Sequence, residues 1–154
     1  MKLDAIDRQI LQILMQDANT SYVDVAKQIH VSAGTIHVRM KNLKRLGVVE
    51  GAQLTINHSL LGLDMVAFLG IYLERSSMYP EVLLKIQKIP EVVNVHYTTG
   101  PYTMFAQVIC KDSQDLYDIL HNQIQEIKGV QRTESFISLS ESIRRPIQIL
   151  GEEE

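Results

Sequence analysis

The side chains whose types and spacing best suit a binding function lie between Ser32 and Arg45. Residues 39–45 hold four cations and no acid. A helix that buries Ile36, Met40 and Leu43 turns a second set of residues outward, at about 100° per residue. That outward set is Gly34, Val38, Lys41 and Arg45, with His37 and Asn42 beside it. The face has little bulk at its start and cations further along.

Such a face suits the major groove of double-stranded DNA. Small residues allow close approach to the bases, and cations and amides reach phosphates and base edges. The predicted DNA-binding residues are Ser32, Ala33, Gly34, Thr35, His37, Val38, Arg39, Lys41, Asn42 and Arg45. The alternative is a basic helix face that is only solvated. The order of the helices and the distribution of charge favour the DNA contact.

Arg39 differs from the other cations of this segment because it lies near the inward side of the helix. Its guanidinium is expected to fold back onto an acid of the first helix, such as Asp4 or Asp7. A contact with a DNA phosphate is the second interpretation, and the sequence leaves both open.

Three short helices are expected to position the basic face. Asp4 is placed to cap a helix over about 4–16, and Ser21 with Asp24 to cap a second one. After a turn at His30-Val31, Ser32 caps the third helix, and Gly47 is placed to end it. This order predicts a helix-turn-helix. Residues 48–56 are predicted to form a short strand or wing, and 57–64 a hinge.

The rest of the chain predicts a second, α+β domain. Apolar strands are expected at 65–73, 92–99, 103–110 and 130–139, with a tight turn at Gly100-Pro101. Helices are expected after Pro80 and from Asp112 to Gly129. The β-α-β-β-α-β order is that of a ferredoxin-like fold. The predicted domains are therefore 1–58, with the helix-turn-helix and wing, 59–140, and a C-terminal tail at 141–154.

Charge is unevenly divided between the two domains. Residues 1–58 carry seven Lys or Arg and five acids, whereas residues 59–154 carry eight and thirteen. This asymmetry indicates a polyanionic partner for the first domain only. A single cysteine, Cys110, fits a reducing compartment. Charges in 1–7 argue against a signal peptide, and the apolar run 60–73 is too short to span a bilayer. The expected location is the cytoplasm, with no membrane partner.

The chain resembles the Lrp/AsnC family of bacterial and archaeal regulators over roughly residues 3–146. The resemblance rests on several motifs in the same order: Leu3-Asp4-x-x-Asp7, Ser32-x-Gly34-Thr35-Ile36-x-x-Arg39, Leu46-Gly47-Val48-Val49-x-Gly51, Tyr97-Thr98-Thr99-Gly100-x-Tyr102 and Val130-x-x-Thr133-x-Ser135. The run from Ser32 to Arg39 and the run from Tyr97 to Gly100 are most similar to the AsnC branch.

The resemblance implies a DNA-binding domain and an effector domain that forms dimers and larger assemblies such as octamers. It also implies an amino acid bound near the turn after the second strand, with asparagine favoured from the AsnC likeness. Carried over by position, the effector residues are Tyr97, Thr99, Gly100, Pro101, Tyr102, Thr103, Gln131, Thr133 and Ser135. Many relatives have an acid where this chain has Thr103, so a contact with the ligand's amino group is expected to differ here.

Two other classes of function were weighed against a DNA-binding regulator. An enzyme is the least favoured, because no catalytic set, metal-ligand spacing, phosphate loop or cofactor motif is present in the sequence. The stronger alternative is an amino-acid sensor whose helical domain binds a protein and not DNA.

Overall fold

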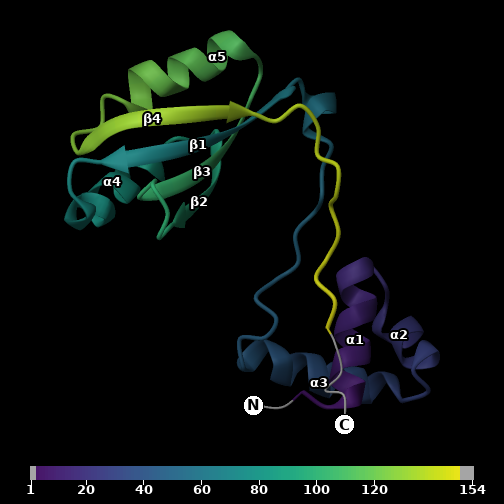
Figure 1. Ribbon diagram of the computed structural model, residues 1–154. Coiled ribbons are helices and arrows are strands. Elements are labelled where there is room, and N and C mark those ends of the chain that lie inside the picture. The colour runs from purple at the N-terminus through teal and green to yellow at the C-terminus, as the bar shows by residue number, and fades with distance from the viewer. Residues whose placement is uncertain (1–2, 150–154) are drawn as a thin grey trace. The chain divides into compact units, whose positions relative to one another are not determined.

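The computed structural model describes residues 3–149, and the chain divides into two compact units (Figure 1). Of the described residues, the first unit comprises 3–55 and 143–149, and the second is Ile56–Ser142. The sequence predicts a boundary at residue 58 and a separate tail at 141–154. In the structure, residues 143–149 belong to the first unit, where Ile149 packs against the helical core.

The first unit is built on three helices, α1 (Ala5–Gln16), α2 (Tyr22–Gln28) and α3 (Ala33–Arg45). Each begins at the predicted cap: the side chains of Asp4, Ser21 and Ser32 accept hydrogen bonds from the backbone three residues later. Their shared core includes Ile10, Val25, Ile36 and Leu43, which are all fully or almost fully buried. The predicted helix-turn-helix is therefore confirmed.

Two backbone positions shape the turns around α3. His30, between α2 and α3, has a φ of 55°, which lies in the left-handed region where residues other than glycine are uncommon. Gly47, after α3, has a φ of 74° and lets the chain reverse so that the Val48 amide donates to the Leu43 carbonyl. Both turns lie where the sequence placed them.

The predicted strand or wing at 48–56 is wrong, because these residues form neither strand nor helix. Val48 and Val49 pack against the helical core, and both amides donate to the Leu43 carbonyl. Residues 50–56 are exposed. A strand needs a second strand to pair with, and the described part of the first unit supplies none.

The second unit is a four-stranded antiparallel sheet in the order β2-β3-β1-β4. The strands are β1 (Met65–Leu73), β2 (Val92–Tyr97), β3 (Met104–Cys110) and β4 (Val130–Ile137). The helices are α4 (Tyr79–Ile86) and α5 (Ser113–Asp118), and α5 continues as a π-helix over Ile119–Ile124. Short 3-10 turns lie at His58–Leu61 and Ser76–Met78. This confirms the ferredoxin-like β-α-β-β-α-β prediction.

The two helices cover one face of this sheet. Alternate residues of β1 (Ala67, Leu69 and Ile71) are fully buried and share a core with Val82 of α4 and Ile119 of the π-helix. Val66, Phe68 and Tyr72 of β1 point to the opposite face and are half-buried. In residues 3–149 no helix is long and apolar enough to cross a membrane.

Candidate DNA interface and effector region

The side of α3 that the sequence analysis turned outward is exposed. Gly34, His37, Lys41, Asn42 and Arg45 are all exposed. Val38 leaves 70% of its surface open, which is a large fraction for an apolar residue. Ile36, Met40 and Leu43 are buried on the other side. The helix therefore has the orientation that the spacing predicted.

The residues at the start of α3 serve its cap. The Ser32 hydroxyl accepts from the Thr35 amide at 3.1 Å and lies 2.9 Å from the Thr35 hydroxyl. Ala33 is half-buried against the helical core. A Cβ on Gly34 would meet only the Ser32 hydroxyl, at 3.6 Å, which is an ordinary contact. The fold therefore does not need glycine at position 34.

Two further polar residues of α3 have neighbours within the first unit. The Arg45 guanidinium donates to the Asn42 side-chain carbonyl at 2.7 Å. The His37 ring meets the Tyr22 ring edge to face, with 4.7 Å between centroids. Both contacts orient side chains on an exposed surface.

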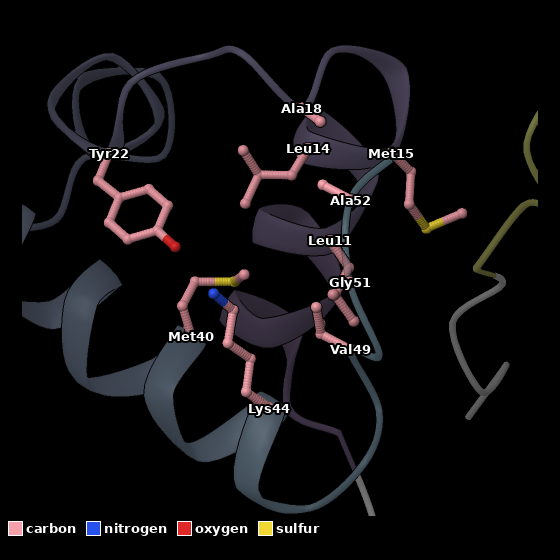
Figure 2. Close-up of a pocket in the computed structure, with 10 residues that line it drawn as sticks. All are labelled: Leu11, Leu14, Met15, Ala18, Tyr22, Met40, Lys44, Val49, Gly51 and Ala52. Carbon is pink, nitrogen blue, oxygen red and sulfur yellow. The ribbon is translucent and has the colours of Figure 1, made fainter. Parts of the chain in front are cut away.

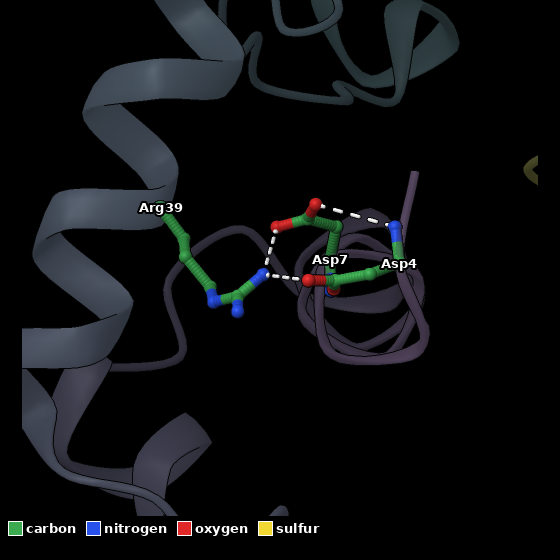
Figure 3. Close-up of polar contacts among 3 residues, drawn as sticks. All are labelled: Asp4, Asp7 and Arg39. Carbon is green, nitrogen blue, oxygen red and sulfur yellow. Dashed lines mark hydrogen bonds and ion pairs between the residues drawn. The ribbon is translucent and has the colours of Figure 1, made fainter. Parts of the chain in front are cut away.

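Arg39 is held by two acids of α1 (Figure 3). Its Nη1 donates to the Asp4 carboxylate at 2.5 Å and to the Asp7 carboxylate at 2.9 Å. Asp4 and Asp7 also form the capping box of α1, because each side chain accepts from the other residue's backbone amide. One cation therefore joins the start of α1 to the middle of α3. The ion pair predicted for Arg39 is confirmed.

This arrangement lowers the pKa of the Asp4 carboxyl below its ordinary value. The largest cause is the hydrogen bond from the Asp7 amide, and the next is the bond from Arg39. The same two carboxylates raise the pKa of Arg39. Both effects favour the charged forms.

The candidate effector loop, residues 98–103, joins β2 to β3. The Thr98 hydroxyl donates to the Tyr102 carbonyl at 2.6 Å, and the Thr98 amide donates to the Thr103 carbonyl at 3.1 Å. The Thr103 amide donates to the Ile71 carbonyl, so Thr103 is tied to β1. Tyr97, Thr99, Gly100 and Pro101 are exposed. A Cβ on Gly100 would touch nothing within 4 Å.

The candidates Thr133 and Ser135 of β4 lie on the sheet face opposite to the one that Tyr102 covers. Thr133 pairs with Ile71 and Ser135 with Leu69, so both share the face that the helices cover. The Thr133 hydroxyl accepts from the Gln125 side chain at 2.8 Å. Gln131 is exposed. Within one chain, Thr103 and Thr133 thus flank Ile71, whereas Tyr102 packs on the opposite face.

Tyr102 belongs to a polar group that the sequence analysis did not find. Its hydroxyl donates to Glu134 at 2.9 Å, and the Tyr72 hydroxyl donates to the same carboxylate at 3.1 Å. Arg132 donates to Glu134 at 2.7 Å, and its guanidinium lies 3.6 Å from the centroid of the Tyr72 ring. The bonds from Tyr102 and Tyr72 lower the pKa of Glu134. Alternation along β4 could have placed Arg132 and Glu134 on one face, but not beside Tyr102.

Aromatic side chains cover the remainder of this open face. Phe68 and Phe105 stack with 5.9 Å between centroids, and Tyr102 contacts both Phe105 and Phe136. Phe136 leaves 47% of its surface exposed. The described residues thus form an aromatic surface with one carboxylate network in it, on the face without helices.

Cys110 is a buried thiol. Burial raises its pKa to about 11, with a further contribution from the nearby carboxylates of Asp115 and Asp112. A thiol with this pKa is a poor nucleophile. Among residues 3–149, no three His, Cys, Asp or Glu side chains are grouped so that they could hold a metal ion.

Comparison with protein families matches both units. Residues 3–44 match the AsnC-type helix-turn-helix domain, and residues 66–147 match the Lrp/AsnC ligand binding domain. The regulatory protein AsnC of Escherichia coli K12 is 41% identical over 146 residues, which cover 95% of this chain and 96% of that protein.

Solved structures agree with this assignment. The structure of E. coli AsnC matches with a TM-score of 0.90 at 40% identity, covering 96% of this chain and 99% of that one. The regulator NMB0573 of Neisseria meningitidis, solved in complex with L-Met, shares the fold with a TM-score of 0.89 at 21% identity, covering 94% of each chain. The chain belongs to the Lrp/AsnC family, and it is a DNA-binding helix-turn-helix transcription regulator with a ligand-binding domain, not an enzyme.

Proposed function

We propose that the chain is a cytoplasmic, sequence-specific regulator that binds double-stranded DNA through the outward face of α3. The observation that carries this proposal is that the cations of α3 lie in two different environments. Arg39 is held by Asp4 and Asp7, while Lys41 and Arg45 stand exposed beside Val38. The uncharged start of the helix enters the groove, and the cations further along contact phosphates.

The salt dependence of DNA binding tests this interface. A preferred duplex is first selected from a random library and then titrated with the protein at several salt concentrations. Each lost phosphate contact flattens the salt slope by about 0.9. The double variant Lys41→Ala/Arg45→Ala is therefore expected to bind more weakly, with a slope reduced by about 2.

The matched control is Lys85→Ala/Lys88→Ala, which removes two exposed cations from the second unit. Its slope should equal that of the unchanged protein. Equal slopes for both double variants would remove Lys41 and Arg45 from the interface. Loss of all duplex binding by the unchanged protein, with amino-acid binding retained, would support a helical unit that binds protein.

We also propose that the second unit associates with a second copy through its open sheet face. Val66, Phe68 and Phe105 are only half-buried there, and Phe136 is more exposed. Contiguous apolar surface of this kind is rare on a monomer. A partner's sheet covers it well, and dimers then assemble further, with an octamer as the expected end state.

Light scattering tests the dimer. Phe136→Glu places a charge on the open face and should shift the protein toward monomer. Leu84→Glu is the matched control, because Leu84 is 64% exposed on α4. A monodisperse monomer in the unchanged protein at micromolar concentration would contradict the proposal.

The effector we propose is a small polar amino acid, with asparagine favoured, bound near the 98–103 loop. The loop exposes Thr99 and Gly100, and the solved complex of NMB0573 with L-Met supports an amino acid as the ligand class. Gly100 leaves room for a ligand carboxylate to approach the backbone amides. Thr103, Thr133 and Ser135 are neutral, so an acidic ligand side chain would be desolvated without a cation.

Calorimetric titration of asparagine, glutamine, aspartate and leucine tests the effector. Asparagine or glutamine should bind more tightly than aspartate, and Gly100→Val should abolish binding. A Cβ at position 100 meets nothing within 4 Å, and circular dichroism of the variant checks that a loss of binding reports on the ligand and not on the fold. Equal binding to both proteins would place the effector elsewhere.

A further inference from the structure

A pocket of about 280 Å³ lies within the first unit, and none of its lining residues belongs to the two sites described above (Figure 2). Its walls come from α1 and the turn after it, from the start of α2, from α3 and from the segment after α3. They are mostly apolar, with Leu11, Leu14, Met15, Met40 and Val49 as the main side chains. The volume is close to the lower limit of known small-molecule sites, which begin at about 300 Å³.

Lys44 supplies the one charge among the ten lining residues. It follows Met40 by about one turn of α3, so the two share a side of the helix that differs from the outward face. In Figure 2 the Lys44 ammonium is directed into the space between Met40 and Leu14. Within residues 3–149, Lys44 has no ion pair or hydrogen-bond partner among the side chains.

Tyr22 adds a second polar group. Its ring packs against His37, and its hydroxyl is directed toward the same space as the Lys44 ammonium (Figure 2). The pocket therefore combines an apolar interior with one cation and one phenol donor. A few convergent polar groups in an apolar cavity are typical of ligand sites.

The charges of the lining select the class of ligand. A carboxylate is attracted by Lys44 and accepts from the Tyr22 hydroxyl, while the apolar body of the ligand contacts Leu11, Leu14 and Met40. No Asp or Glu lines the pocket, so the ammonium group of an amino acid would lie near Lys44 without a counter-charge. The chemistry thus differs from that of the effector loop.

We propose that this pocket binds a small apolar or aromatic carboxylic acid that lacks an amino group. The bound acid bridges α1, α3 and the segment 49–52, whose own hydrogen bonds to α3 are limited to the Val49 amide. It stabilises the DNA-binding unit by mass action. The DNA-binding unit would then have a ligand of its own.

Methionine-methyl NMR of the full-length protein tests the proposal with 3-phenylpropanoate as the probe. Met15 and Met40 line the pocket, whereas Met65, Met78 and Met104 lie in the second unit and act as internal controls. Titration should shift the Met15 and Met40 methyl signals and leave those of Met65, Met78 and Met104 in place. The neutral 3-phenylpropanamide and the zwitterion phenylalanine should bind about threefold to fivefold more weakly, as expected for a partly exposed ion pair.

Two substitutions in α3 distinguish a direct contact of the ligand with Lys44 from an effect of the overall charge of the helix. Lys44→Met should remove the preference for acid over amide, and Lys41→Met, which changes the outward face, should keep it. Ala18→Leu adds bulk to the lining and should reduce binding of every probe at least about tenfold, with the helical circular dichroism unchanged.

Three results would overturn the proposal. The Met15 and Met40 signals could stay in place at millimolar probe, the acid and the amide could bind equally, or both lysine variants could lose the preference equally. If the two methyl signals move on dilution and not with the probe, a second copy of the chain fills the pocket and the small-acid site is excluded.

Discussion

The ring of Tyr102 lies directly over Gly70, so closely that a methyl group at residue 70 would collide with it. Gly70 belongs to β1 and Tyr102 to the loop before β3. The glycine leaves a gap on the open sheet face, and the ring fills this gap while its hydroxyl reaches Glu134. One absent side chain therefore positions the end of the loop that carries the candidate effector residues.

Replacing Gly70 tests this relationship. Gly70→Ala should displace the Tyr102 ring and destabilise the second unit by about 1–3 kcal/mol, the usual cost of overpacking. Urea unfolding gives the measurement. Gly100→Ala is the control, because a Cβ there meets nothing within 4 Å. Equal stability of both variants would show that the ring moves aside without cost.

The Asp4–Arg39 contact should make the stability of the first unit depend on acidity. The folded pKa of Asp4 lies below its ordinary value of 3.8. Its contribution is therefore complete above about pH 4 and is lost as the pH falls through the lowered pKa. Acid unfolding of Arg39→Met should occur at higher pH than that of the unchanged protein. Arg45→Met removes an exposed cation of the same helix and should leave the acid transition in place.

Gly34→Ala should separate folding from DNA recognition. The helix accepts a Cβ at this position, and alanine favours a helix by up to about 1 kcal/mol over glycine. The variant should be as stable as the unchanged protein or more so. If Gly34 faces the groove, its duplex affinity should nevertheless fall, and anisotropy titration beside urea unfolding measures both. Unchanged affinity would argue against close approach of DNA to Gly34.

Glu134→Gln should change how the tyrosines titrate. The hydrogen bond to Glu134 is the largest cause that raises the pKa of Tyr102, and it adds to partial burial in raising that of Tyr72. Without the negative charge, both phenols should ionise at lower pH. Near-ultraviolet absorbance measures the ionisation of Tyr72 and Tyr102, and the four other tyrosines of the chain contribute the same background in both proteins. Glu126→Gln, an exposed site, should leave the titration unchanged.

The sequence by itself determined the helices of the first unit and the order of elements in the second. These features depend on local rules: Asp4, Ser21 and Ser32 cap helices through bonds that span three residues, and Gly47 allows a conformation that other residues avoid. The outward face of α3 also followed from helical periodicity, because one face had to be buried. For Arg39 the sequence left an ion pair and a phosphate contact both open, and the structure shows the ion pair.

Only the tertiary structure decided the features that depend on segments far apart in the chain. Residues 48–56 have strand-like composition but no strand beside them, so they stay irregular. Ile149 returns to the first unit because the helical core offers it apolar contacts. Glu134 meets Tyr72 and Tyr102 across a sheet, and Lys44 lines a pocket that several segments of the first unit build together. Periodicity assigns a residue to a face, but the partner it meets there depends on how distant segments pack.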